Sequence, residues 1–223
     1  MYRSHRTLNA TFAAEGDWQV AAVYTSVAQE LQAARGAGGI ADVSAGGRLG
    51  VRGEALDAVM TKVAGRPCPE AARAVRASLN GSGALVCRVA ADELLVLTAP
   101  AAAGAVEGAL VSACESAGCA HVTDLTSAFA AVELIGPRVP ALLARLVPVE
   151  LSTGAAPPLS VTQAEVARVH GILIRLEHPL PVFHLLVGRE HGEYVWDALL
   201  DAGRDLGLVP IGSQARARLR AEG

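Results

Sequence analysis

Hydrophobic and polar positions follow the same order of patterns in each half of the chain. The runs GRLGVRGEALDAVMTKVAG and AAVELIGPRVPALLARLVP each begin with a short apolar stretch and a glycine. Apolar residues at i, i+3, i+4 and i+7 then follow in both runs, which predicts a short strand leading into an amphipathic helix. Gly136 stands 83 positions after Gly53, and the helical stripes keep that offset.

Two strand-like runs and a second helix follow each of these segments. The first half contains GALVCRV, DELLVLTA and AGAVEGALVSACESAG, and the second contains EVARVHGILIRL, PVFHLLVG and GEYVWDALLDAGRDLG. Leu110 and Leu199 match at an offset of 89. Each half therefore reads as β-α-β-β-α, which predicts an α+β fold with largely antiparallel sheets.

We expect a single domain over residues 1–223, with a first half of about residues 1–120 and a second of about 121–223. The two halves are expected to be related by a pseudo-two-fold axis. The Pro- and Ser-rich segment from Leu151 to Gln163 is read as a loop inside the second half.

Composition and charge exclude several classes of protein. Of the 223 residues, 52% are hydrophobic and 18% are charged, which argues against disorder. A net charge of −3 argues against a protein held to nucleic acid or to an anionic membrane by bulk charge. The chain has no apolar run of about 18 residues and no signal-peptide core at its start, so a cytoplasmic protein is expected.

Motifs for well-known chemistries are absent from the sequence. It contains no Walker loop, no HExxH and no GxSxG, so no catalytic residue is predicted. The four cysteines form no CxxC pair and the histidines show no helical ligand spacing, so free thiols and no metal site are expected. His178 and His184 flank PLPVF, a spacing that could place both on one face of a strand. Trp18 and Trp196 are expected in the core.

Two further features leave alternatives open. Arg216 and Arg220 lie four apart in the last helix, where they face solvent or form a fork for a carboxylate or phosphate. Asp42 and Ser44 in GGIADVSAGG either turn the backbone or face a ligand. The structural reading, in which both side chains bond local backbone groups, is favoured for this pair.

The order of these pieces resembles the folate-binding domain of the glycine cleavage T-protein family. The stretch EGDWQVAAVYTSVAQELQAARGAGGIADVSAGGRLGVRG is similar to the start of that domain, and VTDLTSAFAAVELIGPRVPALL is similar to its strand and "GP" helix entry. The ending GSQARARLRAEG resembles the family's "G…AR..LR.E" segment. The β-barrel that completes true T-proteins would begin after LRAEG, so we expect a fold without it.

The resemblance implies a tetrahydrofolate site inside the domain. The positions that match the family's cavity lining are Tyr24, Asp42, Thr98, Glu177 and Arg216. Glu177 is the only carboxylate in the region where the family places its pterin-binding glutamate, but the glycine-rich approach is missing.

The position of the family's catalytic aspartate falls on Val86 or Cys87, and Asp92 lies beyond it. Neither residue can act as a carboxylate, so we expect weakened or absent aminomethyltransferase chemistry.

One branch of the superfamily fits these losses. The γ subunit of heterotetrameric sarcosine oxidase is similar in size to this chain and lacks the barrel. In that enzyme, the flavins and the folate lie on the partners of the γ subunit. Two hypotheses therefore follow from the resemblance. The chain is a folate-binding protein of one-carbon metabolism, or it is a non-catalytic subunit that works beside flavoprotein partners.

Overall fold

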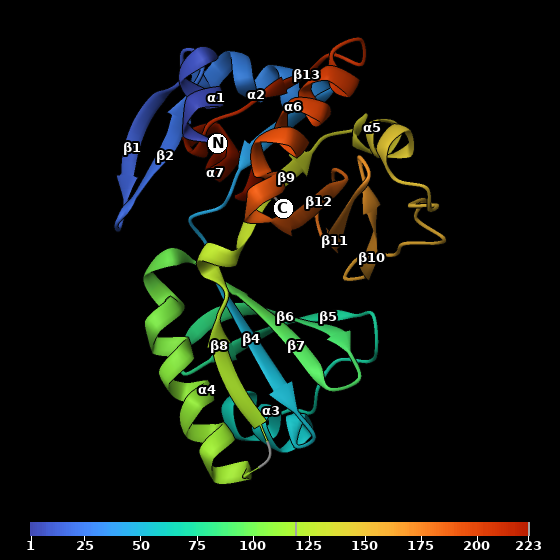
Figure 1. Ribbon diagram of the computed structural model, residues 1–223. Coiled ribbons are helices and arrows are strands. Elements are labelled where there is room, and N and C mark those ends of the chain that lie inside the picture. The colour runs from blue at the N-terminus through green and yellow to red at the C-terminus, as the bar shows by residue number, and fades with distance from the viewer. Residues whose placement is uncertain (119, 223) are drawn as a thin grey trace. The chain divides into compact units, whose positions relative to one another are not determined.

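The computed structural model describes residues 1–118 and 120–222, and the chain folds into two compact units. Unit 1 comprises Met1–Ser44, Phe129–Pro158 and the chain from Thr162 onward. Unit 2 comprises Ala45–Ala128 and Leu159–Val161. In each unit, helices cover a face of an antiparallel or mostly antiparallel sheet (Figure 1). The α+β class expected from the sequence is confirmed.

Unit 2 is built on a five-stranded antiparallel sheet with the order β5-β6-β7-β4-β8. Its strands are β4 (Gly47–Gly53), β5 (Ala74–Leu79), β6 (Ser82–Ala90), β7 (Glu93–Thr98) and β8 (Ala120–Asp124). Its helices are α3 (Leu56–Ala64), η1 (Pro100–Ala102), α4 (Ala103–Ala117) and η2 (Thr126–Ala128). Apolar residues of α3 and α4, such as Met60 and Leu110, pack on one sheet face with Leu49, Val86 and Val96.

Unit 1 is built on a six-stranded sheet with the order β10-β11-β12-β9-β3-β13. Its strands are β3 (Gly38–Asp42), β9 (Phe129–Ile135), β10 (Val161–Val166), β11 (Val169–Leu176), β12 (Val182–Gly188) and β13 (Leu208–Pro210). The helices that follow the repeat are α5 (Val139–Leu146), η3 (Arg189–His191) and α6 (Gly192–Gly203), and α7 (Ser213–Arg220) comes after β13. The β13–β3 pair is parallel, whereas the pairs β11–β12, β12–β9 and β3–β9 are antiparallel.

The N-terminal segment adds further elements to unit 1. These are α1 (Tyr2–Thr7), the two-stranded sheet of β1 (Thr11–Glu15) and β2 (Trp18–Val23), and α2 (Val27–Gly36). Trp196 is fully buried in the core of this unit as expected, whereas Trp18 is 37% exposed, so its expected core position is wrong. Trp18 opposes Glu15 at the turn end of the β1–β2 ribbon.

The internal repeat expected from the offsets is present in the backbone. Gly53 and Gly136 both adopt positive φ angles, 152° and 137°, which an L side chain rarely accepts. The amide of Gly53 donates to the carbonyl of Asp92, and that of Gly136 donates to the carbonyl of Pro181. Each glycine thus fixes its strand–helix junction against the residue just before a later strand of its own repeat, β7 in unit 2 and β12 in unit 1.

The strand that precedes each repeat pairs with the first strand of the other repeat. Strand β3 pairs with β9, and β8 pairs with β4. Both exchanged strands end in an Asp-x-Ser/Thr turn: Ser44 N–H donates to Asp42, and Thr126 N–H donates to Asp124. Neither sheet is therefore formed from one continuous half of the sequence.

Each β-α-β-β-α segment contains one strand more than its sequence pattern predicted, and strands β1, β2, β3, β8 and β13 lie outside those segments. In the first half β5 is additional, and in the second the run EVARVHGILIRL divides into β10 and β11. Asn80 and Gly81 turn the first hairpin, and Ala167 and Arg168 turn the second, all four with positive φ. These tight turns are consistent with two-residue hairpins, which join antiparallel strands without a loop that a hydrophobicity pattern would reveal.

No helix of the described residues is both long enough and apolar enough to cross a membrane.

Candidate functional site

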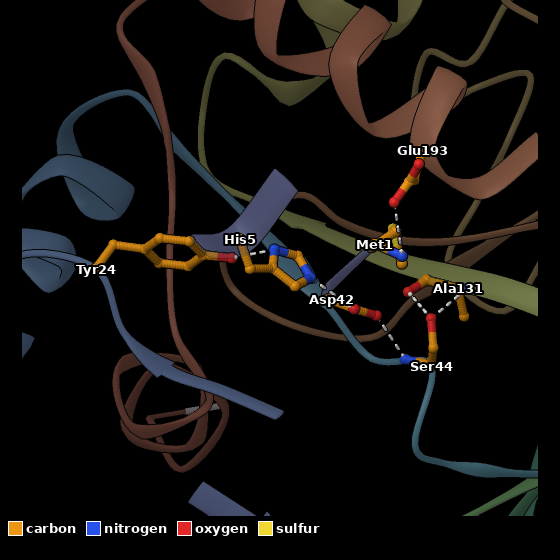
Figure 2. A network of polar contacts seen from close by, with 7 residues as sticks. All are labelled: Met1, His5, Tyr24, Asp42, Ser44, Ala131 and Glu193. Atoms are coloured by element: carbon orange, nitrogen blue, oxygen red, sulfur yellow. Dashed lines mark hydrogen bonds and ion pairs between the residues drawn. The ribbon is translucent and has the colours of Figure 1, made fainter. Parts of the chain in front are cut away.

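A chain of buried polar side chains links the N-terminal helix to the end of β3 in unit 1 (Figure 2). His5 comes from α1, Tyr24 follows β2, and Asp42 ends β3. The Tyr24 hydroxyl lies 2.8 Å from His5 Nδ1, and His5 Nε2 lies 2.8 Å from Asp42 Oδ2. The ring of His5 also packs edge-on against Trp196 at 4.8 Å. This network fastens α1 to the sheet.

The charges of this network follow from its donors. Burial would raise the pKa of Asp42, but hydrogen bonds from His5 and Ser44 lower it below its usual value, so the side chain is a carboxylate at neutral pH. Burial, and then the charges of Asp42 and Glu30, raise the pKa of Tyr24, which keeps its hydroxyl protonated. Since a carboxylate only accepts, the contact with Asp42 requires a hydrogen on His5 Nε2.

Asp42 and Ser44 hold backbone, as the structural reading of GGIADVSAGG expects. Asp42 Oδ1 accepts from the amide of Ser44 at 2.9 Å. The Ser44 hydroxyl accepts from the amide of Ala131 at 3.0 Å, which fastens β3 to β9. Figure 2 shows these contacts beside the ion pair of the Met1 ammonium with Glu193.

A second polar cluster lies on the other face of the unit 1 sheet. Glu133 of β9 and His184 of β12 oppose each other in register, and their side chains meet at 2.6 Å between Oε2 and Nε2. Arg216 of α7 donates from Nη2 to the same oxygen at 3.0 Å. The neighbours Val132 and Leu134 belong to the core with α5 and α6, so alternation along β9 directs Glu133 to the opposite face.

This cluster carries a buried charge. The side chain of Glu133 is 0% exposed, while those of His184 and Arg216 are 17% and 31% exposed. Burial would raise the pKa of Glu133, but His184 and Arg216 hold it at about 2. Burial lowers the pKa of His184 below its usual value. The positive charges of Arg216 and Arg220 also lower this pKa, whereas the contact with Glu133 raises it. The cluster therefore holds an anion, a guanidinium cation and a neutral imidazole that donates from Nε2.

The remaining residues of the expected cavity lining lie elsewhere. Glu177 is exposed just beyond the end of β11. Thr98 ends β7 in unit 2, where its hydroxyl donates to the carbonyl of Ala99. Within unit 1, Tyr24 and Asp42 share the His5 network, and Arg216 belongs to the separate Glu133 cluster.

The position that resemblance assigns to the catalytic aspartate is apolar and buried. Val86 and Cys87 are both 0% exposed in β6. Val86 packs with α3 and α4, so Cys87 faces the opposite side of the unit 2 sheet. Burial raises the pKa of the Cys87 thiol, which keeps it protonated. Asp92 sits in the exposed β6–β7 turn and pairs with Arg52 at 3.3 Å.

Sequence reasoning missed His5, Glu133 and His184 as members of polar clusters. Glu133 left a signal, since it is the one carboxylate within the apolar run FAAVELIG. His178 does not share a strand with His184: it precedes β12 and contacts the carbonyl of Leu219 at 3.0 Å. Cys68, Cys87 and Cys114 are free thiols, and Cys119 lies outside the described residues. No metal-binding group of three or more His, Cys, Asp or Glu occurs among the residues described.

Comparison with known proteins gives one consistent family. The model of the GCVT N-terminal domain matches residues 1–223. An aminomethyltransferase of Frankia alni is 32% identical over 232 residues, covering 100% of this chain and 62% of the relative. One of Saccharopolyspora erythraea is 29% identical over 231 residues, with the same shares covered. The chain thus spans less than two thirds of the length of these relatives.

Solved structures give the same fold. The glycine cleavage system aminomethyltransferase T of Bartonella henselae superposes with a TM-score of 0.83 at 18% identity, over 98% of this chain and 60% of that chain. A chain of heterotetrameric sarcosine oxidase from Corynebacterium sp. U-96 superposes with a TM-score of 0.67 at 21% identity, over 82% of this chain and 93% of that one. A sarcosine oxidase subunit alpha of Rhizobium meliloti is 30% identical over 105 residues, which is 46% of this chain and 11% of that subunit.

Proposed function

The chain belongs to the GCVT N-terminal domain family, and on that premise we propose that it binds a reduced folate as a protein of one-carbon metabolism. Relatives named aminomethyltransferase match it over its whole length. Within the structure, the main support for this proposal is the Glu133–His184–Arg216 cluster. It brings Arg216, which the resemblance matches to a family arginine that faces the folate, together with a buried carboxylate.

The residues of this cluster fit one part of a folate. Glu133 Oε1 is buried without a hydrogen-bond partner among the described residues, so it has an unused acceptor. The ring system of a reduced folate presents N–H donors that suit such an oxygen. Tetrahydrofolate, when bound, would accept the one-carbon unit, and the residues named here would hold and orient its ring.

The same proposal includes weak or absent transfer chemistry in the chain by itself. The position that the resemblance assigns to a catalytic carboxylate is Val86 or Cys87, neither of which is charged. A proton transfer group or counter-charge at that point is typically worth a factor of about 10²–10⁴ in rate. Binding without efficient transfer is therefore the expected behaviour.

Calorimetric titration with 5-formyltetrahydrofolate, a stable reduced folate, tests this function. We expect saturable binding by the wild type and a loss of about tenfold or more in Arg216→Ala, because that change removes a charged hydrogen-bond donor. Arg218→Ala, an exposed arginine on the same helix, is the matched control and should leave affinity unchanged. Absence of wild-type binding at millimolar ligand would refute the proposal.

A second candidate function is that of a non-catalytic subunit in a heteromeric flavoenzyme of the sarcosine oxidase type. The observation that favours it is mutual coverage, since the superposed sarcosine oxidase chain is matched over 93% of its own length. In this case flavoprotein subunits are the partners, and the chain works through its surface. Co-expression with flavoprotein genes adjacent to its own should then yield a stable complex that carries flavin absorbance.

A further inference from the structure

The two asparagines of the chain differ in the residue that follows them. Asn80 precedes Gly81, and Asn9 precedes Ala10. Both asparagines are exposed, and both adopt a positive φ angle, 50° for Asn80 and 59° for Asn9. The side-chain carbonyl of an asparagine is open to attack by the backbone nitrogen of the next residue, because both groups belong to one short segment of chain. The structure around each nitrogen therefore decides which asparagine reacts.

The backbone nitrogen after Asn80 is accessible. Gly81 has no Cβ beside this nitrogen, and a Cβ built there would meet no atom within 4 Å, so the space around it is open. Among the described residues, the Gly81 amide donates to no backbone carbonyl of a turn or loop. At the other site, the amide of Ala10 donates to the carbonyl of His5 at 3.0 Å, and the methyl group of Ala10 lies beside the nitrogen. Attack is therefore favoured at Asn80 and hindered at Asn9.

The place of Asn80 in the fold lets the backbone move during ring closure. Asn80 and Gly81 form the turn of the β5–β6 hairpin, which the pair of Leu79 and Ser82 closes. Strand β5 lies at the edge of the unit 2 sheet. Opening of an exposed hairpin tip at a sheet edge breaks few contacts and costs little free energy. The Gly81 nitrogen can thus reach the Asn80 side chain while the core of unit 2 stays folded.

We propose that Asn80 is a site of spontaneous deamidation, with water as the only co-reactant. The Gly81 nitrogen loses its proton to hydroxide and bonds to Asn80 Cγ, and the side-chain nitrogen leaves as ammonia with a proton from water. Water then adds to one of the two carbonyl carbons of the resulting succinimide and breaks the bond of that carbon to the ring nitrogen. Cleavage at Cγ gives aspartate, and cleavage at the main-chain carbonyl gives isoaspartate. In total, one side-chain amide and one water become one carboxylate and one ammonium ion.

The two products should affect unit 2 differently. Aspartate suits the same turn, since Asp-Gly and Asn-Gly are both preferred in two-residue hairpins with positive φ. Isoaspartate routes the main chain through the former side chain and lengthens the turn by one carbon. This change lies next to Leu79, which is 0% exposed in the core of unit 2. Isoaspartate should therefore loosen the β5–β6 hairpin, whereas aspartate should add a charge without that effect.

Ageing of the full chain in mildly alkaline buffer, followed by peptide mapping with mass spectrometry, tests the proposal. The peptide that contains Asn80 should deamidate about tenfold or more faster than the peptide that contains Asn9. In Asn80→Gly, a change that the positive φ accepts, the acidic species seen by isoelectric focusing should nearly disappear. Asn9→Gly, the matched change at the slower site, should keep the wild-type pattern. A rate at Asn9 equal to or above that at Asn80 would overturn the proposal, and so would an unmodified Asn80 under conditions that convert the urea-unfolded chain completely.

Separation of the aged products by ion exchange tests their structural consequences. Methyl transfer by a protein-isoaspartate methyltransferase identifies the isoaspartate form. This form should melt at a lower temperature than the unmodified protein, and Asn80→Asp, which reproduces the other product, should melt close to the unmodified protein. An isoaspartate form that melts together with the unmodified protein would contradict the loosening of the β5–β6 hairpin.

Discussion

At the scale of single residues, three carboxylates of unit 1, two buried and one 20% exposed, are held in three different ways. Glu30 accepts only from backbone amides, those of Tyr24, Thr25 and Gly212. Asp42 accepts from one amide and from His5. Among the described residues, Glu133 accepts only from two side chains, and its Oε1 has no hydrogen-bond partner. The first two therefore hold the backbone in place, and the third has the capacity to contact a ligand.

Removal of His5 should destabilise the protein strongly. His5→Ala leaves the Tyr24 hydroxyl and Asp42 Oδ2 without their shared partner in a buried setting, and each such loss costs about 1–3 kcal/mol. We expect the free energy of unfolding, from urea titration, to fall by roughly 2–5 kcal/mol. His191→Ala, at an exposed histidine, should change it by less than about 0.5 kcal/mol. Equal effects of the two changes would contradict the structural role of His5.

The Glu133 carboxylate should contribute stability that acid removes. Its pKa in the folded protein, about 2, lies below its ordinary value of 4.5. A lowered folded-state pKa gives stability that is present above the unfolded value and lost as pH falls toward the folded one. The window is therefore pH 4.5 down to about 2.

Thermal unfolding of wild type and Glu133→Gln across this window measures that contribution. At pH 7 the wild type should be more stable, and the difference in melting temperature should shrink as pH falls through the window. The variant does not titrate at this position, so a gap that stays constant from pH 7 to pH 2 would show that Glu133 is not ionised in the folded protein.

At the scale of elements, a strand and a helix come close together at equivalent positions of the two units. The glycine at this contact lies on the strand in unit 2 and on the helix in unit 1. In unit 2, a Cβ on Gly47 of β4 would lie 2.7 Å from the Cβ of Ala103, the first residue of α4. In unit 1, a Cβ on Gly192, the first residue of α6, would lie 2.6 Å from the Cβ of Ala130 of β9. Each strand–helix contact has room for one methyl group, on the helix in unit 2 and on the strand in unit 1.

Exchanging the methyl group in unit 1 should therefore rescue a destabilised variant. Gly192→Ala alone overfills the contact and should cost about 1–3 kcal/mol. The double variant Ala130→Gly, Gly192→Ala restores the arrangement of unit 2 and should recover much of that loss. Urea titrations of the four proteins in the double-mutant cycle measure the coupling. Additive effects would show that the two positions do not share this contact.

The sequence predicted the repeated elements because their spacing is visible in it. The offsets of 83 and 89 located the glycine junctions and both helices of each half, and the folded chain keeps them. The hydrophobicity pattern did not predict strand β5 as a separate element, because only a two-residue turn separates it from its partner β6. Asn80-Gly81 is nevertheless a strong hairpin signal. Ala167-Arg168, which turns the second hairpin, gave no such signal, because neither residue type favours positive φ.

The polar clusters were less accessible to sequence reasoning. Family resemblance pointed to Tyr24, Asp42 and Arg216, but each has a partner that no motif indicated. His5 lies 37 residues before Asp42, and Glu133 lies 83 residues before Arg216. Pairing between β9 and β12 places Glu133 beside His184, and that register follows from the folded sheet.

At the scale of the whole molecule, strand exchange makes the two halves of the sequence depend on each other. The sheet of unit 1 needs β3 from the first half, between β9 and β13. The edge strand β8 of unit 2 is followed by β9 of unit 1. A fragment of residues 121–223 therefore leaves an unpaired edge on β9, and one of residues 1–120 leaves β3 without β9.

Separate fragments of residues 1–120 and 121–223 should accordingly fail to fold alone. We expect poor dispersion in amide proton–nitrogen spectra of each fragment, and native-like dispersion after the two are refolded together. The circular dichroism spectrum should likewise gain secondary-structure signal when the two fragments are mixed. A well-dispersed spectrum of the isolated second fragment would contradict the requirement for β3.

The residues at the position of the family's catalytic carboxylate, Val86 and Cys87, should limit catalysis by the wild-type chain. The matched position for a carboxylate lies on β6, where Val86 packs against α3 and α4 and only Cys87 faces the other side of the sheet. Its thiol stays protonated, so it supplies no negative charge to an iminium-like transition state and no strong base.

With an aminomethyl donor and tetrahydrofolate, we expect no turnover above background by the wild type. Cys87→Asp is the variant able to raise the rate, whereas Val86→Asp should mainly destabilise unit 2 by burying a charge in its core. Robust wild-type turnover that Asp92→Asn abolishes would show that the exposed β6–β7 turn supplies the carboxylate instead.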